Sequence, residues 1–257
     1  MQSISKAVIA IFVIIIVIIG FITATRYAPV QLSSTFTLVK ANWAGYVVQS
    51  AGSDTFSYLN GSWTVPKLSC SSVRSAMLAW VGFGNASGNG PIEQIGTRED
   101  CNGGIASYST WYEFWPQQPN TMKLSLAIEP GDNISASVNY IEGGTFAFLI
   151  KDLSTGLSNK FTNTSLDSSL QSAEWIVEAP LFTNGTRLVM ADFGSISFQN
   201  DWAVIGNHDG RIPYFSSQSY SNAQKWEYIC GGQIKAEPTQ VGNDGAFSVY
   251  WNSVANC

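Results

Sequence analysis

Two glutamates lie four residues apart in a stretch of the chain that otherwise favours a β-strand. The stretch reads SAEWIVEAP, and its Trp, Ile and Val residues prefer a pleated, half-buried surface. Pro180 cannot donate a ladder hydrogen bond, so the strand should end there. Because strand side chains alternate between faces, Glu174, Ile176 and Glu178 share one side. This acidic face is either a solvated sheet surface or the floor of a cleft.

Two further stretches place polar side chains among large aromatic residues. In STWYEFWPQ, Trp111, Glu113 and Trp115 share one face of a predicted strand. In AWVGFGNASGNGPIEQIG, Trp80 ends a predicted strand, and Gln94 follows 14 residues later, beyond a loop rich in Gly and Asn. Carboxylates and an amide can supply a base, an acid and an oxyanion donor.

Most other catalytic sets are absent from the sequence. The single His, His208, lies in the turn-like stretch GNHDGR without a nucleophile elbow, which argues against Ser-His-Asp and Cys-His catalysis. There is no H-E-x-x-H, no P-loop and no G-x-G-x-x-G after a strand, and no two like Asp-containing loops suggest an aspartic-peptidase dyad. We therefore expect neither a metal nor a cofactor.

Together the polar and aromatic stretches form an ordered series of motifs. The series is NWAGYV (42–47), SWTVP (62–66), AWVGFG (79–84), EQIG (93–96), WYEFWP (111–116), SAEWIVE (172–178), ADFGSISF (191–198) and GAFSVYW (245–251). It resembles the glutamic peptidases, or eqolisins, from Asn42 to about Trp251. The resemblance implies a two-sheet antiparallel sandwich and an acid-active endopeptidase whose catalytic pair is one Gln and one Glu.

By motif position, the resemblance assigns the catalytic pair to Gln94 and Glu178. Glu178 would take a proton from water and then protonate the departing amine, while Gln94 would stabilise the tetrahedral oxyanion and position the water. The family's active-site Trp matches Trp80. The residues that we expect to support the pair or bind substrate are Trp80, Trp111, Tyr112, Glu113 and Glu174.

This chain departs from the family pattern at three places near the pair. Family members generally carry an Asp where this chain has Gly84. The segment QIGTREDC is one residue longer than the pattern, so that either Glu99 or Asp100 matches another acid of the cleft. Ala179 follows Glu178 where the family usually has an acidic residue. We expect these departures to alter the pH optimum and the specificity more than the reaction.

The elements that must position these residues are β-strands. They are predicted at 42–50, 56–66, 75–84, 105–116, 122–132, 134–144, 145–152, 174–180, 190–198 and 245–254, with Gly, Asn, Asp or Pro turn signals between them. No run of ten or more residues after the N-terminal segment shows a helical period. The pattern predicts an all-β, antiparallel two-sheet sandwich of the jelly-roll or concanavalin-like kind.

The N-terminal segment predicts export. Ala7 to Ala24 has no charge across 18 residues, which is long enough for a hydrophobic helix to cross a bilayer, although ITA before Thr25 also fits a signal-peptide cleavage site. We therefore expect a membrane anchor or signal segment at 1–26, a connector at 27–41 and the β-sandwich peptidase domain at 42–257. The domain would be extracellular, either secreted or anchored to the outer face of the cell membrane.

Composition fits an exported protein that tolerates acid. Charged residues make up 12% of the chain and its net charge is -5, so few charges would accumulate and repel one another as the pH falls. No basic run suggests nucleic acid. We expect a monomer whose partners are polypeptide substrates and, through the N-terminal segment, the membrane.

The four cysteines predict two disulfides in an oxidising compartment. Three pairings are possible, and proximity along the chain favours Cys70 with Cys101 and Cys230 with Cys257. Possible glycosylation sequons lie at Asn60, Asn85, Asn133, Asn163 and Asn184.

Two other functions remain open on the residues alone. A jelly-roll glycoside hydrolase needs two carboxylates roughly 5 to 9.5 Å apart. Glu174 and Glu178 lie roughly 13 Å apart along one strand, so only Glu113 with Glu178 could form that pair, on adjacent strands. A membrane-tethered sandwich could instead bind glycans or peptides through its aromatic residues without catalysis.

Overall fold

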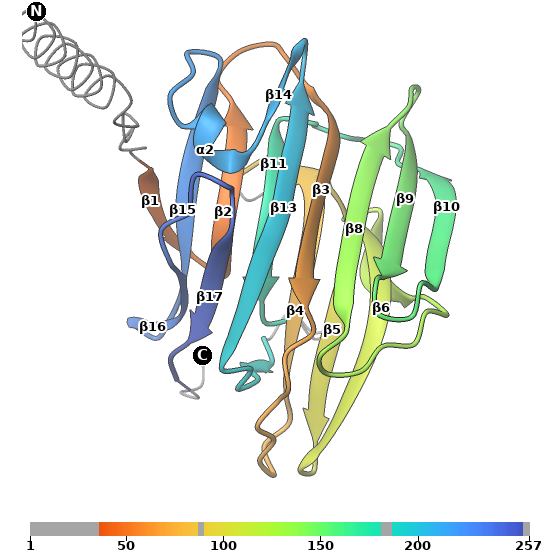
Figure 1. Cartoon of the computed structure of the whole chain (residues 1–257), viewed down its shortest axis with the longest axis vertical. Helices are drawn as coiled ribbons and strands as arrows, with labels where there is room; N and C mark the ends of the chain where they lie inside the picture. The colour runs from red at the N-terminus through yellow and green to blue at the C-terminus, as the bar shows by residue number, and fades with distance from the viewer. Residues whose placement is uncertain (1–35, 87–89, 181–186, 254–257) are drawn as a thin grey trace, which may run out of the picture. The chain divides into compact units, whose positions relative to one another are not determined.

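The computed structural model describes residues 36–86, 90–180 and 187–253, and these residues belong to one compact unit. Two mainly antiparallel sheets pack face to face (Figure 1). The first sheet has the strand order β1 (Thr37–Ala41), β15 (Ser221–Cys230), β2 (Trp43–Ser50), β11 (Ser172–Glu178), β4 (Ser75–Gly84), β5 (Ile92–Asn102), β6 (Ile105–Trp115) and β7 (Gln118–Lys123). The predicted β-sandwich is confirmed.

The second sheet lies in front of the first in Figure 1. Its order is β10 (Ser158–Thr164), β9 (Thr145–Asp152), β8 (Asn133–Tyr140), β3 (Phe56–Thr64), β13 (Ser195–Ile205), β17 (Phe247–Trp251) and β16 (Gln233–Pro238), and pairing of β15 with β16 links the two sheets. Three short elements complete the described part: β12 (Val189–Met190), β14 (His208–Gly210) and the four-residue helix α2 (Ile212–Phe215). Only β1 with β15 and β12 with β4 are parallel pairs among these strands.

The main hydrophobic core fills the space between the sheets. Strand β9, TFAFLIKD, shows how the sequence forms it, because its side chains alternate between buried and half-buried positions along the strand. Phe146, Phe148 and Ile150 thereby point into the core. Strand β4 differs, since all ten of its residues are buried. A strand buried on both faces needs a cover on its outer side as well.

A second, smaller hydrophobic cluster lies on the outer face of the first sheet. Its buried members are Trp43, Val47, Leu78, Trp80, Ala86, Trp111, Ile176 and Trp226. Strand register places several of them side by side, because Ile176 of β11 pairs with Trp80 of β4 and Glu178 pairs with Leu78. The polar residues of the candidate site are set into this aromatic floor.

Not all predicted strands were placed correctly. The prediction of a strand over 122–132 is wrong beyond Lys123, where β7 ends. The backbone there is satisfied by scattered partners instead of a ladder: Leu124 N–H donates to the Thr110 carbonyl and Leu126 N–H to the Asn159 side chain. Strands β1, β5, β10, β14, β15 and β16 were not predicted.

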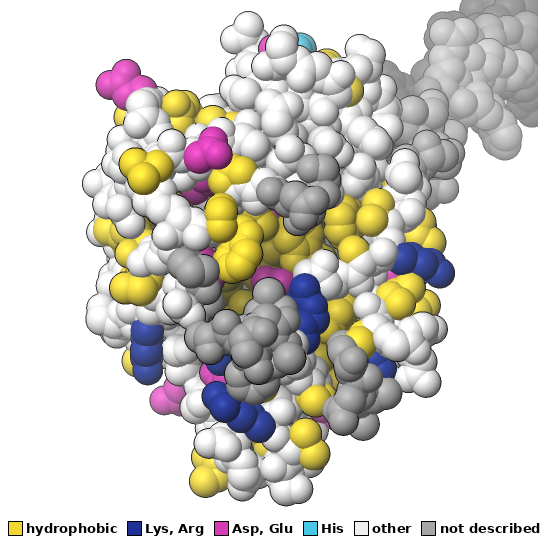
Figure 2. All heavy atoms as spheres, turned by 180° about the vertical axis from the view of Figure 1, so that it is seen from behind, with side chains coloured by type: hydrophobic (Ala, Val, Ile, Leu, Met, Phe, Trp, Pro, Cys, Tyr) yellow, Lys and Arg dark blue, Asp and Glu magenta, His cyan; other side chains and the backbone are white. Residues whose placement is uncertain are grey.

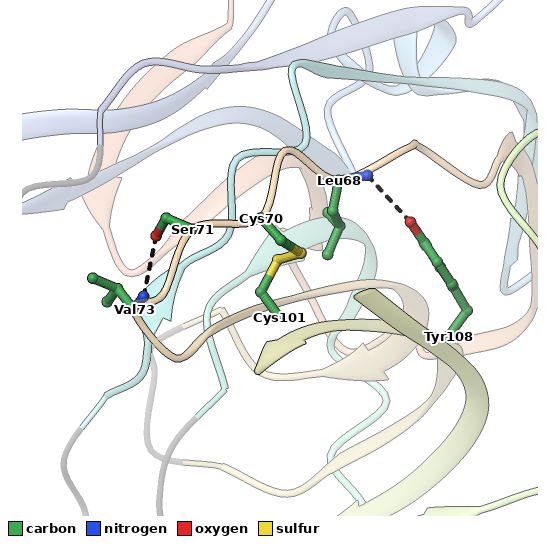
Figure 3. The surroundings of a disulfide bond; sticks show 6 residues. All are labelled: Leu68, Cys70, Ser71, Val73, Cys101 and Tyr108. Carbon is green, nitrogen blue, oxygen red and sulfur yellow. Dashed lines mark hydrogen bonds between the residues drawn. A yellow bond between two sulfur atoms is a disulfide. The ribbon is translucent and has the colours of Figure 1, made fainter. Parts of the chain in front are cut away.

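The predicted disulfide between Cys70 and Cys101 is confirmed, and it ties the segment before β4 to the end of β5 (Figure 3). Beside it, the Leu68 N–H donates to the Tyr108 hydroxyl of β6 at 3.2 Å. The predicted partner of Cys230, Cys257, lies outside the described residues, as do the N-terminal segment 1–26 and Asn184. Between residues 36 and 253, in the parts that are described, no helix is long and apolar enough to cross a membrane.

Candidate active site

Glu178, the last residue of β11, has its carboxylate held by two tryptophans. Trp43 Nε1 donates to Oε2 at 2.9 Å and Trp80 Nε1 donates to Oε1 at 3.2 Å. The two indole rings pack edge to face, with centroids 5.3 Å apart, so each supports the other's position. Since an indole N–H can only donate, this arrangement favours a carboxylate that accepts.

Burial raises the pKa of Glu178 to about 7. The positive charge of Arg187 and the two indole donors act in the opposite direction. Arg187 is fixed beside the site, because Nη1 donates to the Ala179 carbonyl at 3.2 Å. The Asn42 amide, oriented with its oxygen toward the guanidinium, accepts from Nη2 at 2.6 Å.

Gln94, on β5, is nearly fully buried and hydrogen-bonded on one side only. Its Nε2 donates to Glu113 Oε2 at 2.7 Å, while its Oε1 has no hydrogen-bond partner among the described residues. The register explains the contact, because Gln94 lies opposite Glu113 on β6 and opposite Gly82 on β4. A Cβ at Gly82 would lie 2.9 Å from the Cβ of Gln94, so glycine makes room for this side chain.

Glu113 is electrostatically linked to Glu178. Burial raises the pKa of Glu113 to about 8, the negative charge of Glu178 adds to the rise, and the Gln94 hydrogen bond opposes it. Of the two carboxyls, Glu178 therefore ionises at the lower pH, and once ionised it favours a protonated Glu113.

Gln94, Glu113 and Glu178 line one cavity of about 360 Å³. Its walls combine large apolar side chains, including Trp43 and Trp115, with polar and charged ones. Figure 2 looks onto this face of the first sheet and shows hydrophobic side chains gathered around a hollow, with acidic and basic side chains beside them. The cavity therefore offers a carboxylate, an amide and apolar surface to one ligand.

Two arginines of this cavity, Arg98 and Arg187, were not singled out from the sequence. Arg98 makes a bidentate pair with Asp100, with contacts of 2.7 and 2.8 Å. Strand alternation could have placed Arg98 and Asp100 on the same face as Gln94, had β5 been recognised as a strand. No local signal pointed to Arg187, whose position depends on tertiary structure.

Glu174 lies on the same face of β11 as Glu178, but it does not line the cavity. It is fully buried, and its Oε1 accepts from the Ser172 hydroxyl at 2.6 Å. Burial raises its pKa to about 8, with the charges of Glu178 and Glu93 adding to the rise. A Cβ on Gly84 would lie 2.7 Å from Glu174 Oε1, so the missing side chain leaves the space that this carboxyl occupies.

The remaining predicted site residues, Trp111 and Tyr112, are neighbours that point to opposite faces. Trp111 belongs to the aromatic floor, and its Nε1 donates to the Thr97 carbonyl at 2.9 Å. Tyr112 instead packs in the core between the sheets, with its ring centroid 4.7 Å from that of Phe161. Strand alternation thus keeps Tyr112 away from the cavity.

No group of three or more His, Cys, Asp or Glu side chains within the described ranges is placed to hold a metal ion. What the cavity presents is proton-transfer and hydrogen-bonding groups: one carboxyl held by two indoles, a second carboxyl, and an amide with an unpaired carbonyl oxygen. Such a set suits hydrolysis by an activated water.

The chain is similar to known peptidases in sequence and in fold. A model of the peptidase A4 family matches residues 41–242. Aspergillopepsin-2 of Aspergillus niger is 31% identical over 233 residues, which are 82% of this chain and 77% of that protein. The structure of scytalido-glutamic peptidase with a peptide-based transition-state analogue has a TM-score of 0.68 at 22% identity, covering 82% of this chain and 98% of the other. Aspergilloglutamic peptidase from Aspergillus niger has a TM-score of 0.59 at 25% identity, covering 69% and 99%.

Proposed function

The chain belongs to the peptidase A4 family, the glutamic peptidases, and from this membership we propose that it hydrolyses peptide bonds with Glu178 and Gln94 as its catalytic pair. Membership makes it an acid endopeptidase that acts on polypeptides, which decides against a glycoside hydrolase and against binding without catalysis. Family membership gives the reaction, and the assignment of its catalytic pair to Glu178 and Gln94 is the proposal.

The observation that carries the assignment is the unpaired carbonyl of Gln94. Its Oε1 is buried without a hydrogen-bond partner among the described residues, on the cavity that Glu178 also lines. An unsatisfied buried acceptor costs about 1 to 3 kcal/mol, which a water or substrate donor would recover. Glu113 orients the amide by accepting from Nε2, so that Oε1 is left for that donor.

In the proposed reaction, Gln94 Oε1 and the Glu178 carboxylate hold one water between them. Glu178 takes a proton from the water as its oxygen attacks the carbonyl carbon of the scissile peptide bond. The carbonyl oxygen becomes an oxyanion, which accepts from the second N–H of the Gln94 amide. Glu178 then gives the proton to the leaving nitrogen, the C–N bond breaks, and a carboxylic acid and an amine are released.

The surroundings of Glu178 support its role as the group that ionises. Arg187 and the two indoles lower a pKa that burial raises, so Glu178 loses its proton at a lower pH than Glu113. Activity in acid requires Glu178 to ionise below the pKa of about 7 that burial gives it in the absence of substrate, and the Arg187 charge and the two indoles act in that direction. The acidic limb of the kcat/KM profile measures this ionisation in the free enzyme.

The test is to incubate the full-length chain with a denatured protein from pH 1.5 to 7, in the presence of pepstatin, an inhibitor of aspartic peptidases. We expect pepstatin-resistant cleavage in acid that falls about 10²- to 10⁴-fold in Glu178→Gln. A circular dichroism spectrum matching the wild type controls for folding. A folded variant that retains more than a tenth of the rate would rule out Glu178 as the base.

We also propose that the peptidase acts outside the cytoplasm. The Cys70–Cys101 disulfide supports this, because such bonds persist in oxidising compartments. The membrane anchor, the use of the sequons and the monomeric state remain proposals. Mass spectrometry of the exported protein tests the anchor and the sequons. An intact segment 7–24 indicates an anchor, a start near Thr25 indicates a cleaved signal, and added glycan mass at the sequons indicates that they are used. Light scattering of the detergent-solubilised protein tests the monomeric state.

A further inference from the structure

A second cavity, of about 440 Å³, adjoins the candidate active-site cavity on the outer face of the first sheet. The two cavities share Arg98 and Thr121 as lining residues, so they are neighbouring parts of one trough. The second extends along β5 and β6 toward the hairpin that joins them, near Cys101. A chain bound across the catalytic pair could therefore reach it.

The second cavity is positively charged, although the whole chain carries a net charge of -5. Arg74, Arg98 and Lys123 contribute three positive charges to its lining and Asp100 one negative charge, an excess of two positive charges. Asp100 forms its bidentate pair with Arg98. Lys123, exposed at the end of β7, has no ion-pair partner among the described residues.

Position along β5 sets the distance between the charged cavity and the reacting bond. Arg98 follows Gln94 by four residues on the same face, which corresponds to roughly 13 Å. An extended peptide spans that distance with about four residues. The hydroxyl-bearing Ser107 and Ser109 lie opposite Asp100 and Arg98 on β6 and add possible hydrogen-bond donors to the lining.

We propose that this second cavity, the anionic subsite, binds an ionised Asp or Glu side chain of the polypeptide substrate, about four residues from the scissile bond. The inference rests on the proposed peptidase function and adds a substrate class to it. A free Glu side chain has a pKa of about 4.3, so it is mostly ionised at pH 5 and mostly neutral at pH 3. The preference for acidic substrates should therefore be present in weak acid and disappear in strong acid.

The experiment uses neutral fluorogenic peptides with one cleavage point, in which a single Glu, or Gln as its uncharged match, is moved through five positions on each side. At one position, three to five residues from the scissile bond, kcat/KM at pH 5 should be about fivefold higher with Glu than with Gln. At pH 3 the ratio should fall to about one. Equal values for Glu and Gln at every position at pH 5 would overturn the proposal.

Variants connect the preference to the cavity. Lys123→Gln and Arg74→Gln, which change residues lining only the second cavity, should each lower the Glu-to-Gln ratio toward one. Lys160→Gln is the matched control, because it removes the same charge from β10 of the other sheet and should keep the ratio. A ratio that survives the double variant of Lys123 and Arg74 would assign the preference elsewhere and overturn the subsite.

A binding measurement separates this proposal from that of the catalytic pair. Calorimetry with the full-length Glu178→Gln variant at pH 5 compares the best Glu peptide with its Gln match without turnover. Tighter binding of the Glu peptide that depends on Lys123 would support the subsite even if the wild type cleaved no peptide. Equal affinity for the two peptides would overturn the subsite, whatever the outcome for catalysis.

Discussion

The two faces of the first sheet both carry buried carboxyl groups, but in different surroundings. On the core face, Glu93 and Glu99 of β5 point between the sheets, opposite residues such as Phe83 and Met77. On the outer face, Glu178 and its neighbours line a cavity. Burial raises the pKa of Glu93 and Glu99 to about 8, and the pKa values of the cavity glutamates are raised as well. A raised pKa therefore distinguishes neither face.

What distinguishes the outer face is the cavity beside two of its carboxyl groups, Glu113 and Glu178. Glu178 accepts from two indoles and Glu113 accepts from Gln94, and all three groups border a cavity that a substrate can enter. Glu99 is fully buried and lines neither cavity. We therefore expect the core-face glutamates to affect stability and the residues of the outer-face cavity to affect the reaction.

The largest expected effect is on stability and comes from substituting Glu99. Its pKa is about 8 in the folded chain and about 4.3 when unfolded, so it is protonated in both states in strong acid. As the pH rises from about 4.3 to 8, only the unfolded state releases the proton, and folding loses stability. Glu99→Gln does not titrate and should be about 3 to 5 kcal/mol more stable than the wild type near pH 8.

Urea unfolding of the full-length chain at pH 4 and pH 7.5 measures this difference. The two proteins should have similar unfolding midpoints at pH 4, and Glu99→Gln should keep wild-type kcat/KM there. An equal loss of stability in both proteins between the two pH values would mean that Glu99 is not a source of the pH dependence.

The next largest expected effect is on the reaction and comes from substituting Gln94. This residue follows Glu93 in β5 and points to the outer face of the sheet, whereas Glu93 points to the core face. Gln94→Ala removes the proposed oxyanion donor and should lower kcat/KM in acid about 10²- to 10³-fold. It should lower the free energy of unfolding by only about 1 to 2 kcal/mol, since one hydrogen bond to Glu113 is lost. Peptide cleavage at the wild-type rate would leave Gln94 without a catalytic role.

A smaller effect concerns the pH range of the reaction. Arg187→Gln removes the positive charge that lowers the pKa of Glu178, so that pKa should rise. The acidic limb of the kcat/KM profile should then move up by about one pH unit. Arg187→Lys keeps the charge and should keep the limb close to its wild-type position. The same shift in both variants would point to lost contacts with Ala179 and Asn42 as its cause.

The sequence predicted strand β11, which carries Glu178, but it did not predict strand β5, which carries Gln94. Strand alternation placed Glu174 and Glu178 together, because β11 has strongly strand-forming residues between them. Strand β5 was missed because IEQIGTREDCN carries polar residues on both faces, including Glu93 and Glu99 in the core. Such residues disfavour strands by propensity, and their burial is decided by tertiary packing.

The smallest expected effect compares two tryptophans on opposite faces of the sheet. Trp80→Phe removes the 3.2 Å hydrogen bond to Glu178 but keeps most of the apolar packing, so kcat/KM should fall about fivefold, equivalent to about 1 kcal/mol. Trp175→Phe removes a comparable hydrogen bond on the core face, from Nε1 to the Asn60 carbonyl at 2.8 Å. It should lower stability by about 1 kcal/mol and leave kcat/KM unchanged. If both substitutions lowered kcat/KM equally, the reaction would depend on the packing of the whole sheet. The proposal that the outer face affects the reaction and the core face affects only stability would then be wrong.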